Sequence, residues 1–196
     1  MQQATVQLGK LGVQSIVNSM GVFVSAAFAA VNRIDDFAYI PQQNIAHAMT
    51  ALMAQNKGAK KTDRIKAAFR CGMKIELIYG IFIFFVCFFL AHPLMQLFSS
   101  DPVVCKHGMT YLKLISLMYL FPAVTNGVQG YFRGIGDLKI TLISSFVNMS
   151  VRVIFAAVLV FHFSLQIEAL PFSYLAGWIG MLVAEIPLLI YFLSYT

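Results

Sequence analysis

Long apolar stretches recur along this chain, and each can cross the hydrocarbon core of a membrane as a helix. Such a crossing takes about 20 apolar residues. Six stretches meet this requirement: residues 11–31, 37–56, 71–91, 109–131, 138–161 and 170–193. Hydrophobic residues make up 59% of the 196 positions and charged residues 11%, whereas soluble domains average roughly 45–50% and 25%. The sequence therefore predicts an all-α integral membrane protein, a single six-helix transmembrane bundle over residues 1–196 in the lipid bilayer.

The charged residues are concentrated in one segment, residues 57–70. Six of its fourteen residues are Lys or Arg and one is Asp, and apolar stretches flank it on both sides. Because cytoplasmic loops carry an excess of cations, we expect this loop in the cytoplasm. A second loop with Arg133 and Lys139 falls on the same side. Alternating crossings then predict a multi-pass protein of the plasma (inner) membrane with both termini cytoplasmic.

The same arrangement accounts for the net charge of +6. The cations lie in loops and at the ends of spans, where anionic lipid headgroups attract them. Aromatic and basic residues do not interleave in the sequence as a nucleic-acid-binding surface requires, so we expect no nucleic-acid partner. The three cysteines are odd in number and lack CxxC spacing, which indicates packing thiols rather than disulfides or a metal site.

Turn and break signals divide the spans. We expect residues 32–36, which hold more acid than base, to form an outer turn between the first two spans. Pro122 is expected to break the fourth span, because proline removes a backbone hydrogen bond. The freed carbonyls can bind an ion or a polar group, and a simple packing kink is the alternative. Asp137 is placed to cap the fifth helix.

Polar side chains inside the spans are the candidates for a substrate or cation path, since such residues are costly in hydrocarbon and mark transport pathways. Interhelical hydrogen bonds are the alternative explanation. The candidates are Gln14, Asn18, Gln42, Gln43, Asn44, His47, Asn126, Gln129, Arg152 and Glu185.

Two of these candidates are the charged residues Arg152 and Glu185. Counted from the cytoplasmic ends of their spans, they fall at similar depths, and we expect them to pair across adjacent antiparallel helices. The alternative is that Glu185 has a functional role of its own, as ionisable residues in spans often do. His47 is expected to be a hydrogen-bonded structural residue, with proton transfer as the alternative.

Catalysis is the competing class of function. A membrane-embedded enzyme needs a constellation such as HExxH, GxSxG or paired intramembrane aspartates. The sequence holds none of these motifs. We therefore expect no enzyme activity, no catalytic residue, no metal ligand and no cofactor.

Four segments resemble the C-terminal half of a MATE (multidrug and toxic compound extrusion) efflux transporter. They are LGKLGVQS at residues 8–15, AQNKGA at 54–59, LFSSDPV at 97–103 and YFRGIGD at 131–137. Their order and spacing cover the whole chain. The resemblance implies one lobe of a twelve-helix protein made of two six-helix bundles, with the N-terminal half or a second half-transporter as partner.

The same resemblance implies a function. Such proteins export small organic cations in antiport with sodium ions or protons. The family often places carboxylates inside its bundles, whereas the first and fourth spans here hold only amides such as Gln14 and Asn126. The main coupling carboxylate is therefore expected in the other half. A flippase for lipid-linked saccharides from the same superfamily is the alternative, and a structural or regulatory membrane subunit is a further one.

Overall fold

The structure, a computed structural model, describes residues 2–195 and the side chains of residues 4–194. Within these residues the chain folds into eight α-helices and no strand, which confirms the predicted all-α class. The helices are α1 (Gln2–Asn18), α2 (Val22–Gly58), α3 (Thr62–Phe89), α4 (Ala91–Gln96), α5 (Pro102–Ser116), α6 (Leu120–Gly134), α7 (Leu138–Phe161) and α8 (Ala169–Tyr195).

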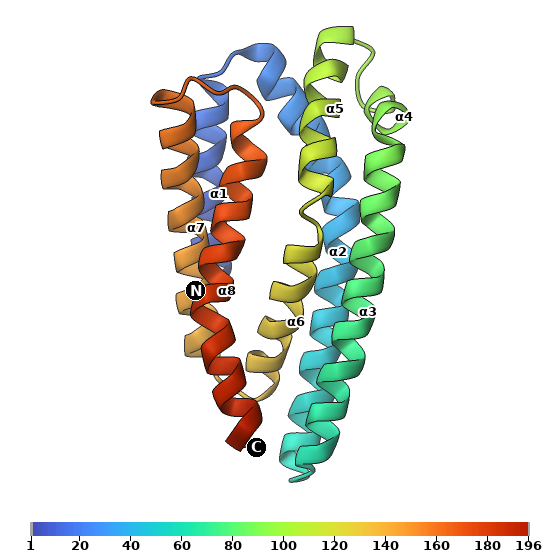
Figure 1. Cartoon of the computed structure of the whole chain (residues 1–196), viewed down its shortest axis with the longest axis vertical. Coiled ribbons are helices and arrows are strands. Elements are labelled where there is room, and N and C mark those ends of the chain that lie inside the picture. The colour runs from blue at the N-terminus through green and yellow to red at the C-terminus, as the bar shows by residue number, and fades with distance from the viewer. Residues whose placement is uncertain (1, 196) are drawn as a thin grey trace.

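The helices form two groups that lie side by side along the long axis of the molecule (Figure 1). In one group, α7 packs against α1 and α8; in the other, α2 packs against α3, α5 and α6. We call the end of the bundle that holds the turns at residues 59–61 and 135–137 the basic end. The connections at residues 19–21 and 162–168 and the segment 90–101, which contains α4, lie at the opposite end.

The first two helices differ from the predicted spans 11–31 and 37–56. Helix α1 ends at Asn18, and α2 then runs without interruption from Val22 to Gly58. The break falls at Gly21, whose φ is +99°, a left-handed backbone conformation that glycine adopts without steric cost. The turn between the first two helices therefore lies at residues 19–21 and not at residues 32–36, as the sequence predicted.

Residues 32–36 are wrong as a turn because they lie inside α2. The Asp35 carboxylate does not contact lipid, since Asp35 is buried in the protein. Helix α2 has 37 residues, about 55 Å at the usual rise, so it exceeds the thickness of a hydrocarbon core of about 30 Å. The charged segment is therefore compatible with one long helix, in which Asp35 is buried while Arg33 and Asp36 are exposed.

The predicted break in the fourth span is confirmed. Helices α5 and α6 together are long and apolar enough to cross a membrane, and they are bent by 52° at the break between them. Pro122 lies in the first turn of α6, where its ring blocks a continuous helix through residues 117–119. The bend brings Tyr119 into the interior, where its side chain is fully buried.

Caps and turns order the two ends of the bundle. The Asp137 carboxylate accepts a hydrogen bond from the backbone N–H of Ile140 at 3.4 Å, which confirms the predicted cap of α7. At the opposite end, Asp101 caps α5 by accepting from the N–H of Val103 at 2.7 Å. Lys57 of α2 donates to the backbone carbonyl of Ile135 and so ties the two turns of the basic end together.

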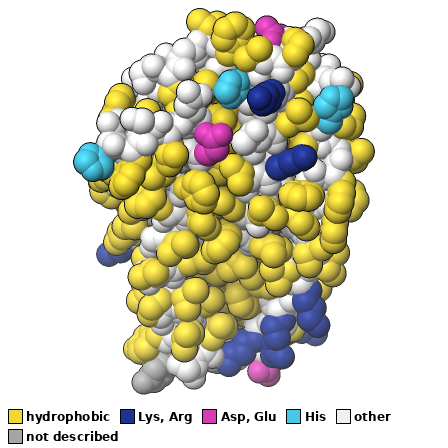
Figure 2. Space-filling model, turned by 45° about the horizontal axis from the view of Figure 1, so that its top comes forward, with side chains coloured by type: hydrophobic (Ala, Val, Ile, Leu, Met, Phe, Trp, Pro, Cys, Tyr) yellow, Lys and Arg dark blue, Asp and Glu magenta, His cyan; other side chains and the backbone are white. Residues whose placement is uncertain are grey.

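The surface is that of a multi-pass membrane protein. In Figure 2, apolar side chains cover the middle of the visible face, and Lys and Arg side chains gather near one end. Helices α3, α7 and α8 each have the length and apolarity of a membrane span. Large side chains such as Phe82, Phe146 and Ile154 are exposed on them, as expected for a surface that contacts lipid.

Candidate functional site

A cavity of 600 Å³ lies between the two helix groups, with α1, α2, α6, α7 and α8 in its wall. Helix α2 contributes a stripe of side chains at intervals of three and four residues, the spacing of one helix face. The stripe consists of Phe28, Asn32, Asp35, Asp36, Tyr39, Ile40, Gln43 and His47. Several of the polar residues that make α2 a poor membrane span, among them Asp35, Gln43 and His47, therefore line the cavity.

Asp35 is the most buried acid of this stripe, with 7% of its surface exposed. The hydroxyl of Tyr119 donates a hydrogen bond to Oδ1 of Asp35. A hydrogen bond to a carboxylate is stronger than one between neutral groups. The bend between α5 and α6, where Tyr119 lies, is therefore linked directly to an acidic group in the cavity wall.

Aromatic side chains from α2 and α8 form part of the cavity wall. Tyr39 of α2 stacks on Trp178 of α8, with ring centroids 6.5 Å apart, and Tyr174 meets Trp178 edge-on at 5.9 Å. The guanidinium group of Arg152 lies over the ring of Tyr174. These residues all line the cavity, so its wall combines aromatic faces with a cation.

Arg152 is 8% exposed and interacts electrostatically with Asp35 across the cavity. Its Nε has no hydrogen-bond partner among the described residues. A buried guanidinium with an unused donor is costly unless a partner arrives. The site therefore contains an anionic and a cationic group on facing walls, and the cationic group has a free donor.

The predicted pairing of Arg152 with Glu185 is wrong. Ser144 of α7 donates a hydrogen bond of 2.5 Å to Glu185 of α8, while Arg152 packs beside Gly177 of α8. Ser144 and Arg152 are eight residues apart on one helix, or about 12 Å along its axis. The prediction failed because depth counted from helix ends ignored the register in which the antiparallel helices α7 and α8 pack.

Helix α6 adds a smaller polar network near Glu185. Gln129 donates a 3.2 Å hydrogen bond to the hydroxyl of Ser145 on α7, and Arg133 donates to the backbone carbonyl of Gln129 at 3.3 Å. Both Gln129 and Arg133 interact electrostatically with Glu185. Gln129 thus makes an interhelical hydrogen bond, the alternative considered from the sequence, and it also lines the central cavity.

The cavity brings together six of the ten residues predicted to line a path: Gln14, Gln43, His47, Asn126, Gln129 and Arg152. The other four do not line it: Asn18, Gln42, Asn44 and Glu185. Asn18 is exposed at the end of α1, where it accepts a 2.8 Å hydrogen bond from Gln14. Gln42 is buried on another face of α2, and Asn44 is exposed.

Sequence reasoning missed the acids and aromatic groups of the site. Asp35 and Asp36 were assigned to a turn, and Tyr39, Tyr174 and Trp178 carry no motif. Asn32, Asp35, Tyr39, Gln43 and His47 do share a three-and-four spacing on α2. This spacing becomes visible only when residues 22–58 are read as one helix.

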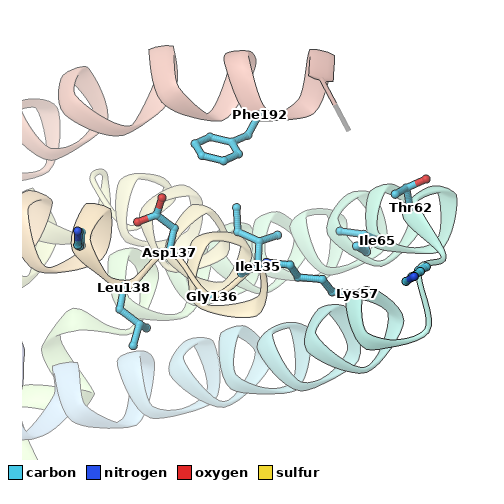
Figure 3. Close-up of a pocket in the computed structure, with 10 residues that line it drawn as sticks. Lys57, Thr62, Ile65, Ile135, Gly136, Asp137, Leu138 and Phe192 are labelled. Atoms are coloured by element: carbon cyan, nitrogen blue, oxygen red, sulfur yellow. Dashed lines mark hydrogen bonds between the residues drawn. The ribbon is translucent and has the colours of Figure 1, made fainter.

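A second cavity, of 820 Å³, lies at the basic end. Figure 3 shows Phe192 of α8 above Ile135 and Asp137 of the α6–α7 turn, with Lys57 and Ile65 alongside. Lys60 and Lys139 complete its charged rim. Its wall consists mainly of turn residues and helix ends, in contrast to the central cavity.

A sequence model of the MatE family matches residues 1–158. The chain belongs to the MatE family. The predicted resemblance to MATE transporters is confirmed.

Among its relatives, a probable multidrug resistance protein NorM from Thermotoga maritima is 26% identical over 175 residues, covering 87% of this chain and 36% of that protein. A protein named FAD transporter from Shewanella oneidensis is 27% identical over 121 residues, or 60% of this chain and 27% of that protein.

The fold of this MatE chain also matches a solved structure. The outward-facing form of a multidrug resistance MATE family transporter of the MOP superfamily matches with a TM-score of 0.90 and 18% sequence identity. The match covers 100% of this chain and 45% of that one. The chain therefore spans less than half the length of the proteins to which it is similar.

Proposed function

We propose that this chain is the C-terminal lobe of a secondary active multidrug efflux transporter in the inner membrane. It exports organic cations in antiport with sodium ions or protons. One observation carries the substrate class: the central cavity sets the Asp35 carboxylate beside the stacked rings of Tyr39 and Trp178. Aromatic faces attract cations, and a nearby carboxylate adds charge complementarity.

A partner half is supported by the exposed face of α2. Arg33, Asp36, Gln43, Asn44 and His47 are all exposed on this helix. In the hydrocarbon region, polar side chains need protein or a water-filled cavity around them. A second lobe on this face would enclose the central cavity, and it would be supplied by an N-terminal half or by a second copy of this chain.

A second candidate function is the export of phosphate-bearing compounds, including the lipid-linked saccharides of a flippase. Lys10, Arg133 and Arg152 also line the central cavity, and cations of this kind bind phosphate groups. The relative named FAD transporter is in keeping with this candidate. Asp35 and Asp36 in the same wall oppose it, since like charges repel an anionic substrate.

Transport into proteoliposomes separates the two candidates. We expect the protein, together with its partner half, to move a cationic dye when a sodium or pH gradient is imposed. Asp35→Asn should reduce this transport by about tenfold, the factor that corresponds to ~1.4 kcal/mol of lost interaction. Asp101→Asn is the matched control, because asparagine caps a helix as well as aspartate does.

Three results would contradict the proposal. They are transport of FAD or of a lipid-linked saccharide in place of the dye, unchanged dye transport by Asp35→Asn, and an equal loss in both variants. Robust dye efflux by the chain as a monomer would remove the need for a partner half.

Orientation is tested by cysteine labelling in intact cells. We expect Lys60→Cys, at the basic end, to resist an impermeant maleimide, because cation-rich loops stay in the cytoplasm. Ser100→Cys, at the opposite end, should be labelled. Both variants need a Cys71→Ser background, since Cys71 is exposed. The reverse labelling pattern would invert the proposed topology.

A further inference from the structure

A group of buried polar atoms outside the hydrogen-bond networks described above has no partner among the described residues. Both carboxylate oxygens of Glu76 on α3 and both carboxamide atoms of Gln42 on α2 lack a hydrogen bond. Glu76 is 0% and Gln42 1% exposed. Asn126 of α6 also has a buried Nδ2 without a partner. Leaving such groups unpaired is costly, most of all for a carboxylate.

Helix packing places Gln42 and Asn126 at the same level. Helices α2 and α6 run in parallel, and Ala46 packs so closely on Gly130 that a Cβ on Gly130 would lie 2.9 Å from the Ala46 carbonyl oxygen. Gln42 lies one turn before Ala46, and Asn126 lies one turn before Gly130. Since residues four apart share a helix face, Gln42 and Asn126 lie on the facing sides of α2 and α6.

Helix α3, which packs against both α2 and α6, places Glu76 at the same level as Gln42 and Asn126. It runs antiparallel to α6, with Gly80 against Ala123 and Met73 against Gly127. Glu76 lies between Met73 and Gly80, so it falls opposite residues 123–127 of α6, the stretch that contains Asn126. One turn toward the basic end, Gly72 of α3 packs against Met49 of α2, so this face of α3 also meets α2.

We propose that Gln42, Glu76 and Asn126 form a binding site for a sodium ion between α2, α3 and α6. A carboxylate and carboxamide oxygens are the hard oxygen ligands that such cations prefer. One carboxylate balances one positive charge, which favours a monovalent ion. The described residues contain no group of three or more His, Cys, Asp or Glu side chains that could hold a metal ion, as a polyvalent or transition metal would require.

A bound cation explains more than a bound proton does. Protonation of Glu76 would remove its charge and would supply one O–H donor, which can satisfy a single acceptor oxygen. A sodium ion would engage the Gln42 oxygen and the Glu76 carboxylate at the same time. Asn126 also lines the central cavity, so the ion has a route of entry from that cavity. That the ion drives export rests on the function proposed above, whereas its binding does not.

Thermal unfolding of the full chain in detergent at pH 8 tests the site. Sodium chloride is titrated against choline chloride at constant ionic strength. We expect a saturable rise in melting temperature with sodium, because a ligand stabilises the state that binds it. Glu76→Gln should abolish the rise, and Gln42→Met should raise the half-saturating sodium concentration by about tenfold. Glu185→Gln, which changes the buried carboxylate bound to Ser144, should keep the wild-type titration.

A melting temperature independent of sodium would overturn the proposal, as would an unchanged sodium response in Glu76→Gln. Stabilisation at low pH alone would identify Glu76 as a neutral carboxylic acid and would also overturn it. If Glu76→Gln does not fold, the sodium titration of Gln42→Met decides whether the site exists, since this variant retains the Glu76 carboxylate.

Intact sodium binding without dye transport would contradict the transport proposal and not the sodium site. Dye transport without sodium binding would contradict the proposed sodium site and not the transport proposal.

Discussion

Tyr119→Phe is expected to lower the free energy of unfolding by about 1.5–3 kcal/mol, the range for a hydrogen bond to a charged group. Tyr119 is fully buried, and its hydroxyl donates to the buried carboxylate of Asp35. The phenylalanine ring fills the same space, so the change removes the hydrogen bond and little else. The melting temperature of the detergent-purified protein measures the effect.

Tyr111→Phe is the matched control. Tyr111 lies in α5 and is also 0% exposed, but its hydroxyl has no hydrogen-bond partner among the described residues. Removing an unsatisfied buried hydroxyl should be neutral or stabilising, because the desolvation cost disappears with it. Equal destabilisation by the two substitutions would show that the Tyr119–Asp35 bond contributes nothing specific.

Gly177→Ala is expected to destabilise the packing of α7 on α8 by about 1–3 kcal/mol, the usual cost of overpacking. A Cβ at this position would lie 2.9 Å from the backbone carbonyl oxygen of Asn148 and 3.3 Å from Cβ of Arg152. Backbone atoms cannot rotate away as the end of a side chain can, so the helices would have to separate. The melting temperature of the purified variant measures the loss.

Gly180→Ala, one turn further along α8, serves as the control. Its Cβ would meet Val151 at 3.5 Å and Val147 at 3.6 Å, which are ordinary van der Waals contacts. The alanine should be tolerated and should even favour the helix. A Gly177→Ala protein as stable as Gly180→Ala would mean that α7 and α8 do not approach as closely as described here.

The local signals in the sequence predicted the elements that depend on neighbouring residues alone. Asp137 caps α7, and the predicted span 138–161 coincides with α7 (Leu138–Phe161). Pro122 marks the bend in the fourth span. In each case the determining contact is made within a few residues, so sequence spacing is enough to predict it.

The prediction failed where a distant contact decided the outcome. The acids at residues 32–36 suggested a loop, yet these residues lie inside α2, and Tyr119, far away in sequence, supplies a hydrogen bond that offsets the burial of Asp35. Gly21 is an unremarkable glycine in an apolar stretch until its positive φ is known. Glu76 drew no attention in the sequence, although it is fully buried.

By itself, the sequence determined that the chain is an all-α membrane protein of the MatE family. The length of the apolar stretches and the local motifs can be read directly from the order of the residues. Only the tertiary structure decided which polar groups meet. The register of α7 on α8 separates Arg152 from Glu185 and places Glu185 on Ser144. The packing of α2, α3 and α6 brings Gln42, Glu76 and Asn126 to one level. These pairings depend on the axial position of one helix relative to its neighbour. The spacing of residues within a single helix carries no information about that relative position.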